Sequence, residues 1–169
     1  MKKLLYVIFF GFLAAGFFLN SCAPKAKQNE NPVVKTTYGA VSGIVEDSIY
    51  IFRGIPYAQA ERFMPPQNPD VWEGVLECND FGPVAKQVTP WIADSAMDEK
   101  KLFSVNVWTR GITDGKKRPV MFWLHGGGFF QGSSNDPMTY GKAMAKKGDI
   151  VFVSVNHRLN ILGFLDLSA

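Results

Sequence analysis

A triplet of glycines directly after an apolar strand constrains this chain more than any other feature of its sequence. The run reads Leu124-His125-Gly126-Gly127-Gly128-Phe129-Phe130. Three glycines cost backbone entropy and add no packing, so they make sense where the main chain takes unusual dihedrals or approaches a ligand closely. We interpret the run as an oxyanion-hole loop, in which the N–H groups of Gly127 and Gly128 would hold the charged oxygen of a tetrahedral intermediate.

A nucleotide-binding turn is the first alternative for this loop, because Gly126, Gly128 and Gly132 form a loosely spaced glycine fingerprint. A dinucleotide turn holds the pyrophosphate at the N-terminus of a helix that follows its glycines at once. Here the next predicted helix begins only near Asp136, too far from these glycines. The strand that follows this helix ends in residues 156–158, which contain no acidic residue to bind a ribose. A loop that is rich in glycine only to turn a corner is the second alternative.

Two further side chains are candidate reactive groups, and both are predicted to be structural. His125 leaves the strand just before the glycines, where its ring can hydrogen-bond to the loop backbone. Cys78 has no nearby histidine and no activating pattern, so we predict a small packing residue rather than a nucleophile. Because the only other cysteine is Cys22, the sequence does not describe a disulfide scaffold.

The first residues have the pattern of an export signal. Lys2 and Lys3 precede an unbroken apolar stretch over residues 4–19. This stretch is short for a membrane span of roughly 20 residues and fits the apolar region of a signal peptide. We therefore predict a signal peptide over residues 1–21.

The segment Leu19-Asn20-Ser21-Cys22 resembles a bacterial lipobox, although Asn20 is an uncommon choice at its position. We predict that Cys22 carries lipid and that residues 22–32, rich in Lys, Asn, Gln and Pro, form a tether. The protein would then be exported and held at the bacterial cell envelope, at the outer membrane or the periplasmic face. An ordinary secretory signal with an incidental cysteine is the alternative.

Composition excludes several classes of protein. With 169 residues, of which 47% are hydrophobic and 14% aromatic, the chain can bury one ordinary core. Removing residues 1–21 takes away Lys2 and Lys3 and no acid, which lowers the formal charge from +3 to +1. No basic patch is evident along the remaining sequence, so we predict no nucleic-acid partner.

The first half of the chain predicts short antiparallel strands followed by loop. Residues 33–52 alternate apolar and polar side chains, with Asp47-Ser48 as one turn, and predict a meander. Residues 54–90 contain six prolines and predict mostly loop. A strand is predicted over residues 102–109, with residues 110–118 as a hairpin connection.

The second half predicts a parallel strand pair with a helix between. Residues 120–124 are apolar on both faces, which predicts a central strand buried between two layers. Asp136 is the expected N-cap of a helix over residues 137–147 that Gly148 ends. A strand over residues 150–155 completes a βαβ unit, so the predicted class is α/β.

Five segments carry a pattern that extends well beyond the glycine loop. They read Gly39 to Gly43, Phe52 to Ala58, Asn106-Val107-Trp108, Pro119 to Phe129, and Val153 to Leu159. In this order and spacing they resemble the N-terminal part of a type-B carboxylesterase, the α/β-hydrolase group that includes cholinesterases and bacterial esterases. The resemblance covers about residues 36–166.

This resemblance implies the N-terminal part of an α/β-hydrolase over residues 33–169, with antiparallel strands leading into a mostly parallel sheet. It implies two-step hydrolysis of a small-molecule ester, without a cofactor or metal, in which Gly127 and Gly128 are oxyanion donors. The family's serine lies in a Gly-x-Ser-x-Gly elbow, followed by an acid and a histidine. No such elbow occurs in these 169 residues, and Ser133-Ser134 lacks its spacing. We therefore expect a fragment that does not hydrolyse esters alone.

Several positions depart from the family pattern. Ala85 and Leu102 stand where the resemblance implies a disulfide, and Lys100 stands where it implies a glutamate that pairs with Arg53. We expect Asp98 or Glu99 to pair with Arg53 instead. His157 replaces a tyrosine and Asn160 a glycine, and we expect a structural role for His157.

Two functions from different classes follow from these patterns. The first is a lipid-anchored ester hydrolase of which this chain supplies the oxyanion-hole half. The second is a catalytically inactive lipoprotein that uses the hydrolase scaffold for binding or adhesion at the surface. Expressed alone, residues 23–169 are expected to be poorly soluble, because residues 150–155 would form an apolar edge strand.

Overall fold

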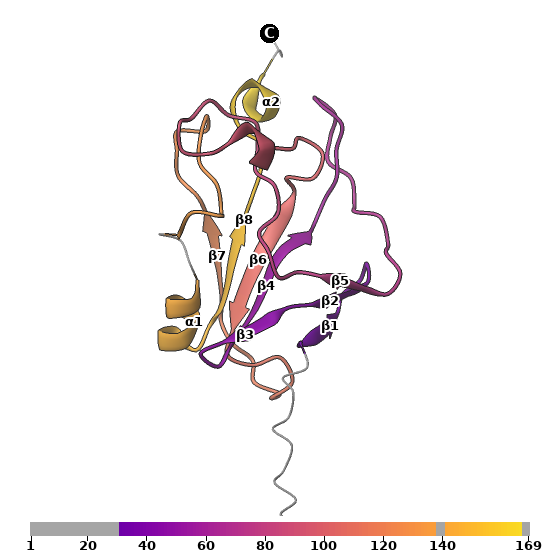
Figure 1. The fold of residues 1–169 in the computed structure, drawn as a ribbon, viewed down its shortest axis with the longest axis vertical. Coiled ribbons are helices and arrows are strands. Elements are labelled where there is room, and N and C mark those ends of the chain that lie inside the picture. The colour runs from indigo at the N-terminus through magenta and orange to yellow at the C-terminus, as the bar shows by residue number, and fades with distance from the viewer. Residues whose placement is uncertain (1–30, 138–140, 167–169) are drawn as a thin grey trace, which may run out of the picture. The chain divides into compact units, whose positions relative to one another are not determined.

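Two β-sheets organise the part of the chain that the structure describes (Figure 1). The structure is a computed structural model, and it describes residues 31–137 and 141–166. The predicted signal peptide over residues 1–21, the predicted lipid site at Cys22 and most of the tether lie outside these residues. Contacts group Asn31–Ala169 into one folded unit.

The main sheet joins the antiparallel strands to a parallel pair. Its five strands, in spatial order, are β3 (Ile44–Glu46), β4 (Ile49–Pro56), β6 (Ser104–Thr109), β8 (Val151–Val155) and β7 (Val120–Leu124). Each neighbouring pair is antiparallel except β7 and β8, which run parallel. The predicted α/β class, with antiparallel strands leading into parallel ones, is confirmed.

A small second sheet contains β1 (Val33–Lys35), β2 (Ala40–Ser42) and β5 (Val75–Glu77). Strand β2 pairs with β1 in antiparallel and with β5 in parallel fashion. The sequence predicted mostly loop where β5 lies. A strand of three residues is too short to show an alternating pattern in the sequence. Strand β5 forms because β2, which is distant in sequence, provides partners for its backbone hydrogen bonds.

The turn between β3 and β4 confirms one local prediction. Asp47 and Ser48 both have positive φ, at 50° and 65°. Two left-handed residues in a two-residue loop match the right-handed twist of the strands they join. The predicted hairpin over residues 110–118 is wrong, because β8 lies between β6 and β7 in the sheet.

Helix α1 (Lys142–Gly148) begins later than predicted. Its N-cap is Gly141 rather than Asp136, and residues 138–140 of the predicted helix lie outside the described residues. The left-handed residue at its end is Asp149, at φ 46°, so the expected stop at Gly148 is one residue early. Asp149 tolerates this conformation better than most residues do.

Two shorter helical segments complete the described elements. They are the 3-10 helix η1 (Asp94–Ala96) and helix α2 (Asn160–Phe164). Neither described α-helix has the length and apolar character needed to span a bilayer.

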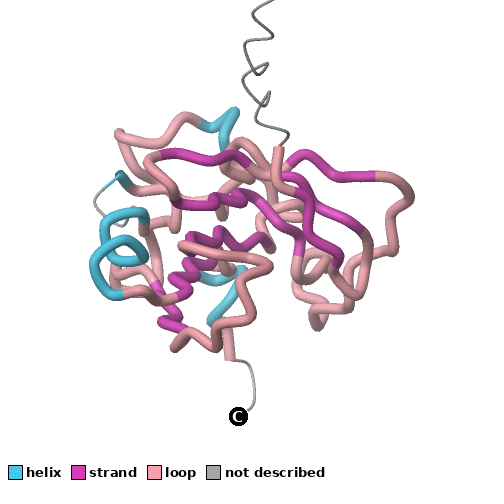
Figure 2. Tube along the Cα trace, turned by 90° about the horizontal axis from the view of Figure 1, so that it is seen from below, coloured by secondary structure: helices cyan, strands magenta, loops and turns pink. Residues whose placement is uncertain are grey.

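One apolar cluster lies between α1 and the main sheet. Helix α1 packs on β4, β6 and β8 (Figure 2), and the buried side chains there are Ile49, Ile51, Trp108, Ala145 and Phe152. A side chain at Gly141 would overlap the rings of Trp108 and Phe152. Glycine therefore lets the first turn of α1 approach the sheet closely.

Strand β7 is the edge of the main sheet, which corrects two predictions. Residues 120–124 are not buried between two layers, since Val120, Phe122 and Leu124 are 65%, 59% and 63% exposed. The predicted edge strand at residues 150–155 is instead internal, because β8 inserts between β6 and β7. No described element covers the outer side of β7.

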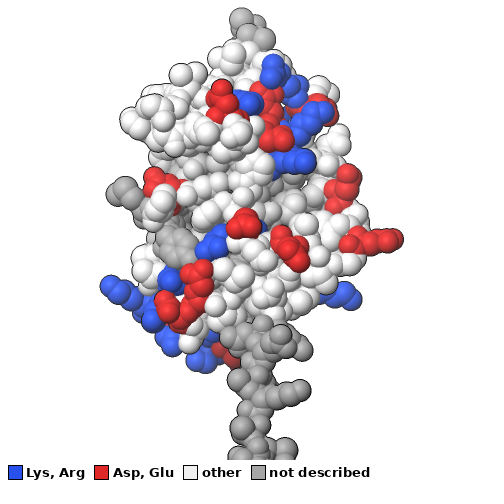
Figure 3. Space-filling model, in the orientation of Figure 1, with Lys and Arg blue, Asp and Glu red and all other residues white. Residues whose placement is uncertain are grey.

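Charged side chains are unevenly distributed over the surface. Figure 3 shows Lys and Arg gathered at the lower left and again at the upper right of the face in view, with Asp and Glu beside them in both places and across the middle. The lower end is the one where α1 and the connection from β6 to β7 lie in Figure 1.

We expect residues 23–169, expressed alone, to self-associate through β7, because its backbone edge and apolar side chains are open to solvent. Phe122→Lys should raise the monomeric fraction in sedimentation velocity without changing the circular dichroism spectrum. A monomeric unsubstituted segment that unfolds cooperatively on heating would contradict this expectation.

Candidate active site

The glycine loop leaves the C-terminal end of β7 and requires glycine at defined positions. Gly127, Gly128 and Gly132 have φ of 126°, 63° and 113°, in the left-handed region that side chains disfavour. A Cβ at Gly127 would also overlap the carbonyl oxygen of Gln131. Gly126 differs, because a Cβ there meets no atom within 4 Å.

Backbone donors of the loop remain available for a ligand. The carbonyl oxygen of Gly127 accepts hydrogen bonds from the N–H groups of Phe130 and Gln131, at 3.3 and 3.2 Å, which closes the turn. Within the described part of the chain, the N–H groups of Gly127 and Gly128 donate no hydrogen bond. Two adjacent backbone donors without a partner are the groups that the predicted oxyanion hole would use.

These glycines line a cleft of ≈ 750 Å³ at the end of β7 and β8. Its other walls include Tyr57, Phe122 and Phe164, and no charged side chain occurs among the described residues that line it. The hydroxyl of Tyr57 donates to the carbonyl oxygen of Asn156 at 2.8 Å, and burial raises the pKa of Tyr57. An apolar cleft strengthens a hydrogen bond to a developing anion, because little water competes for it.

Two histidines stack at the mouth of the glycine loop. The rings of His125 and His157 are parallel within 3°, with centroids 4.6 Å apart. Each Nδ1 contacts a neighbouring carbonyl oxygen, that of Gly126 at 2.9 Å and that of Arg158 at 2.7 Å. Burial, with a smaller effect of His157, lowers the pKa of His125 although its hydrogen bond to Gly126 acts in the opposite direction. The predicted contact of His125 with the loop backbone is confirmed, and a structural role for His157 stays a prediction.

Gln87 and Asn160 fix the loop from outside. The side chain of Gln87 donates to the carbonyl oxygen of Gly132 at 3.0 Å and accepts from its N–H at 2.7 Å. The N–H of Asn160 donates to the carbonyl oxygen of Phe129 at 2.6 Å. Asn160 has φ 52°, which explains how asparagine serves at a position where the family has glycine.

A buried network of asparagines and serines fixes the far end of the loop. Asn106, in the middle of β6, donates to the hydroxyls of Ser134 and Ser154 at 2.9 and 3.1 Å. Asn156 accepts from the N–H of Ser134 at 2.8 Å and donates to the side chain of Asn135 at 3.1 Å. The network therefore joins β6, β8 and the loop.

Two candidate nucleophiles of this chain, Ser134 and Cys78, are buried. Ser134 is buried and its hydroxyl is held by Asn106, in agreement with the absence of an elbow around Ser133-Ser134. Cys78 is buried against Val41 and Phe52, and desolvation raises the pKa of its thiol to about 11. The prediction that Cys78 is a packing residue is confirmed.

The expected partner of Arg53 is wrong. Its guanidinium contacts the carboxylate of Glu46 at 3.3 Å, because Arg53 lies on β4 and Glu46 on the neighbouring strand β3. Glu99 instead accepts two hydrogen bonds from Arg62, both 2.7 Å. Asp98 accepts from the backbone that follows it, which lowers its pKa despite partial burial.

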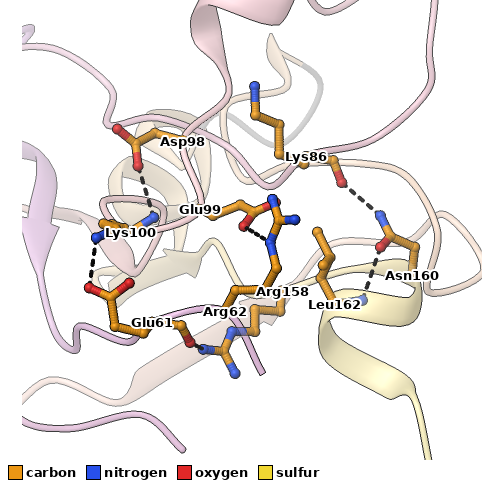
Figure 4. Close-up of polar contacts among 9 residues, drawn as sticks. All are labelled: Glu61, Arg62, Lys86, Asp98, Glu99, Lys100, Arg158, Asn160 and Leu162. Atoms are coloured by element: carbon orange, nitrogen blue, oxygen red, sulfur yellow. Dashed lines mark hydrogen bonds and ion pairs between the residues drawn. The ribbon is translucent and has the colours of Figure 1, made fainter. Parts of the chain in front are cut away.

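Ion pairs hold the loop beside the cleft (Figure 4). Besides the two bonds from Arg62 to Glu99, Lys100 contacts Glu61 at 2.7 Å, and this contact raises the pKa of Lys100. Arg158 donates to the carbonyl oxygen of Glu61 at 2.7 Å. These contacts tie residues 61–62 to residues 99–100 and to the end of β8.

Ala85 and Leu102 lie in one buried apolar cluster with Phe103 and Leu159. These are the positions where the resemblance implies a disulfide. The structure thus places both in the same core, with apolar packing where the family has a covalent link.

Comparison with known proteins identifies the family. The family model described as "Carboxylesterase family" matches residues 30–169. The chain belongs to the carboxylesterase family. Over 145 residues it is 35% identical to the para-nitrobenzyl esterase of Bacillus subtilis, a match that covers 81% of this chain and 29% of that protein. It is 38% identical over 146 residues to the phenmedipham hydrolase of Pseudarthrobacter oxydans, covering 79% and 29%.

Solved structures of carboxylesterases and related esterases agree with this family assignment. A polyester-hydrolysing esterase from Clostridium hathewayi superposes with a TM-score of 0.75 at 41% identity, covering 83% of this chain and 30% of that one. A carboxylesterase from Geobacillus stearothermophilus gives 0.71 at 44%, covering 80% and 28%. The chain therefore spans less than a third of the length of these relatives.

Sequence reasoning found the glycines but missed the side chains that position them. Gln87, Asn106 and Asn156 are buried polar side chains in segments that were interpreted as loop or strand. A polar residue inside an apolar strand, as Asn106 is between Val105 and Val107, was the available signal. No group of three metal-ligating side chains occurs among the described residues.

Asn156→Ala should destabilise the chain by about 2 kcal/mol, because it leaves the buried N–H of Ser134 without an acceptor. Urea unfolding of the full-length protein measures the effect. Gln59→Ala is the matched control, since its hydrogen bond to Asp70 is exposed, and it should change stability by less than about 0.5 kcal/mol. Equal losses in the free energy of unfolding for both variants would contradict the role given to Asn156.

Proposed function

We propose that this chain forms the oxyanion-hole part of a serine carboxylesterase that cleaves small-molecule esters through an acyl-enzyme. The observation that carries the proposal is the pair of free N–H donors at Gly127 and Gly128 beside an apolar cleft. Family membership and relatives named as esterases support it.

The loop would act when a nucleophile attacks the ester carbonyl. Negative charge then develops on the carbonyl oxygen, and preorganised N–H groups stabilise that charge without having to reorient. Gly127 and Gly128 supply donors, while Gln87 and Asn160 hold the loop in place. The family's Gly-x-Ser-x-Gly elbow does not occur in these 169 residues, so the proposed enzyme would need a longer chain that carries the serine, its acid, its histidine and a third N–H donor after the serine.

Gly127→Ala in the full-length protein should lower kcat for p-nitrophenyl butyrate by about 10²- to 10³-fold, because a Cβ displaces the turn by overlapping Gln131. Gly126→Ala, which adds a Cβ in open space, should leave kcat within about threefold of the unsubstituted protein. Gly128→Ala tests the second donor with less strain, since its Cβ meets only the side chain of Phe130.

Equal kcat in the Gly126→Ala and Gly127→Ala variants would contradict the oxyanion role. Full-length protein that carries another residue in place of the elbow serine and does not turn over esters would favour the second hypothesis, an inactive binding or adhesion lipoprotein. The 169-residue segment alone should show no hydrolysis above background.

We also propose that the protein is exported and anchored to the bacterial envelope by lipid on Cys22, on the basis of the lipobox-like segment before it. Cys22→Ser should abolish incorporation of a labelled fatty acid and release the protein from the membrane fraction. Labelling that persists in this variant would show that the cysteine is incidental.

A further inference from the structure

Basic side chains from two separate segments converge at the end of the main sheet opposite the cleft. The segments are the connection before β7 and helix α1 with its C-cap. Arg118 pairs with Asp149 at 2.8 Å, and Arg110 donates to the carbonyl oxygen of Lys146 at 3.3 Å. The pKa of Asp149 is lowered mainly by Arg118, with Lys116 and Arg110 contributing. This basic end is defined by Arg110, Lys116, Lys117, Arg118, Lys142, Lys146 and Lys147.

Part of this charge is neutralised locally, and part is not. Arg118 is bound by Asp114 and Asp149, and Lys142 by Glu46 and Asp47. The other five cations are exposed and form no ion pair with any residue that the structure describes. The basic end therefore holds three more cations than anions, although the mature sequence has a formal charge of only +1.

Topology fixes this end relative to the cleft. Strands β7 and β8 run parallel with Val120 opposite Val151, so residues 118 and 149 lie at their N-terminal ends. The glycine loop follows Leu124, at the other end of β7, about 16 Å away at the rise of a β-strand. The glycine loop and the basic end therefore lie at opposite ends of β7 (Figure 1).

The chain enters the fold near the basic end. The carbonyl oxygen of Pro32 accepts from the N–H of Gly43, and β3 runs from there to Asp47, which contacts Lys142 at 3.0 Å. The segment from Cys22 to Pro32 reaches no farther than about 40 Å when fully extended. A lipid on Cys22 would therefore hold Pro32 within about 40 Å of a bilayer.

We propose that the basic end is a docking surface for anionic lipid headgroups, which orients the protein with its cleft facing away from the membrane. The orientation rests on the proposed lipid anchor, whereas headgroup binding does not. Exposed lysines and arginines near an anionic bilayer each add to binding, and salt screens the attraction. Ester substrates would then reach the cleft from solution rather than from the bilayer.

Vesicle co-sedimentation tests the surface without the anchor. Full-length protein beginning at Ala23, made without leader or lipid, should bind vesicles of one-third phosphatidylglycerol in phosphatidylcholine. Binding to pure phosphatidylcholine should be at least about tenfold weaker, and binding should fall as NaCl rises from about 0.05 M to about 0.5 M. Lys116→Glu/Lys117→Glu should lower binding to the anionic vesicles by at least about tenfold.

Lys86→Glu/Lys101→Glu is the matched control, because it makes the same change in net charge at the cleft end, and it should retain most of the binding. Equal losses in both double variants would overturn the surface, since net charge alone would then explain binding. No binding to anionic vesicles would also overturn it. If the lipidated protein nevertheless fractionates with membranes, the proposed lipid anchor on Cys22 would still stand.

Discussion

The hydrogen bonds of Asn106 and Asn156 are the interactions on which the candidate site depends. Both side chains are fully buried, where an unmet polar group is costly. Asn106 on β6 holds Ser134, and Asn156 directly after β8 holds the backbone of the same serine. The glycine loop is thereby fixed to two strands of the main sheet, although the strand that it leaves, β7, is open on its outer side.

The glycine loop is therefore held mainly by residues outside β7, the strand that leads into it. At the β7 end, His125 stacks on His157, which follows β8, while Gln87 and the asparagine network hold the other end. A loop of left-handed glycines has little intrinsic preference for one conformation. Its definition comes from buried polar contacts, which is why its geometry depends on residues far from it in sequence.

The sequence was most informative where local pattern decides the outcome. Residues 120–124 form a strand as predicted, because five apolar residues bounded by Pro119 and the glycines leave little choice. The burial of that strand, the place of β8 inside the sheet and the partner of Arg53 were all wrong, since each depends on which strands become neighbours. Strand β5 and helix α2 were missed because tertiary pairing, rather than propensity, creates elements of three and five residues.

The core around Ala85 and Leu102 is held without the disulfide that the resemblance implies there. Ala85 and Leu102 pack in a common core, and the exposed contacts of Arg62 with Glu99 and of Lys100 with Glu61 close the loop above them. This part of the protein can therefore reach its folded state without waiting for thiol oxidation. It should form equally well in a reducing cytoplasm and in an oxidising envelope, so producing it requires no disulfide-forming host.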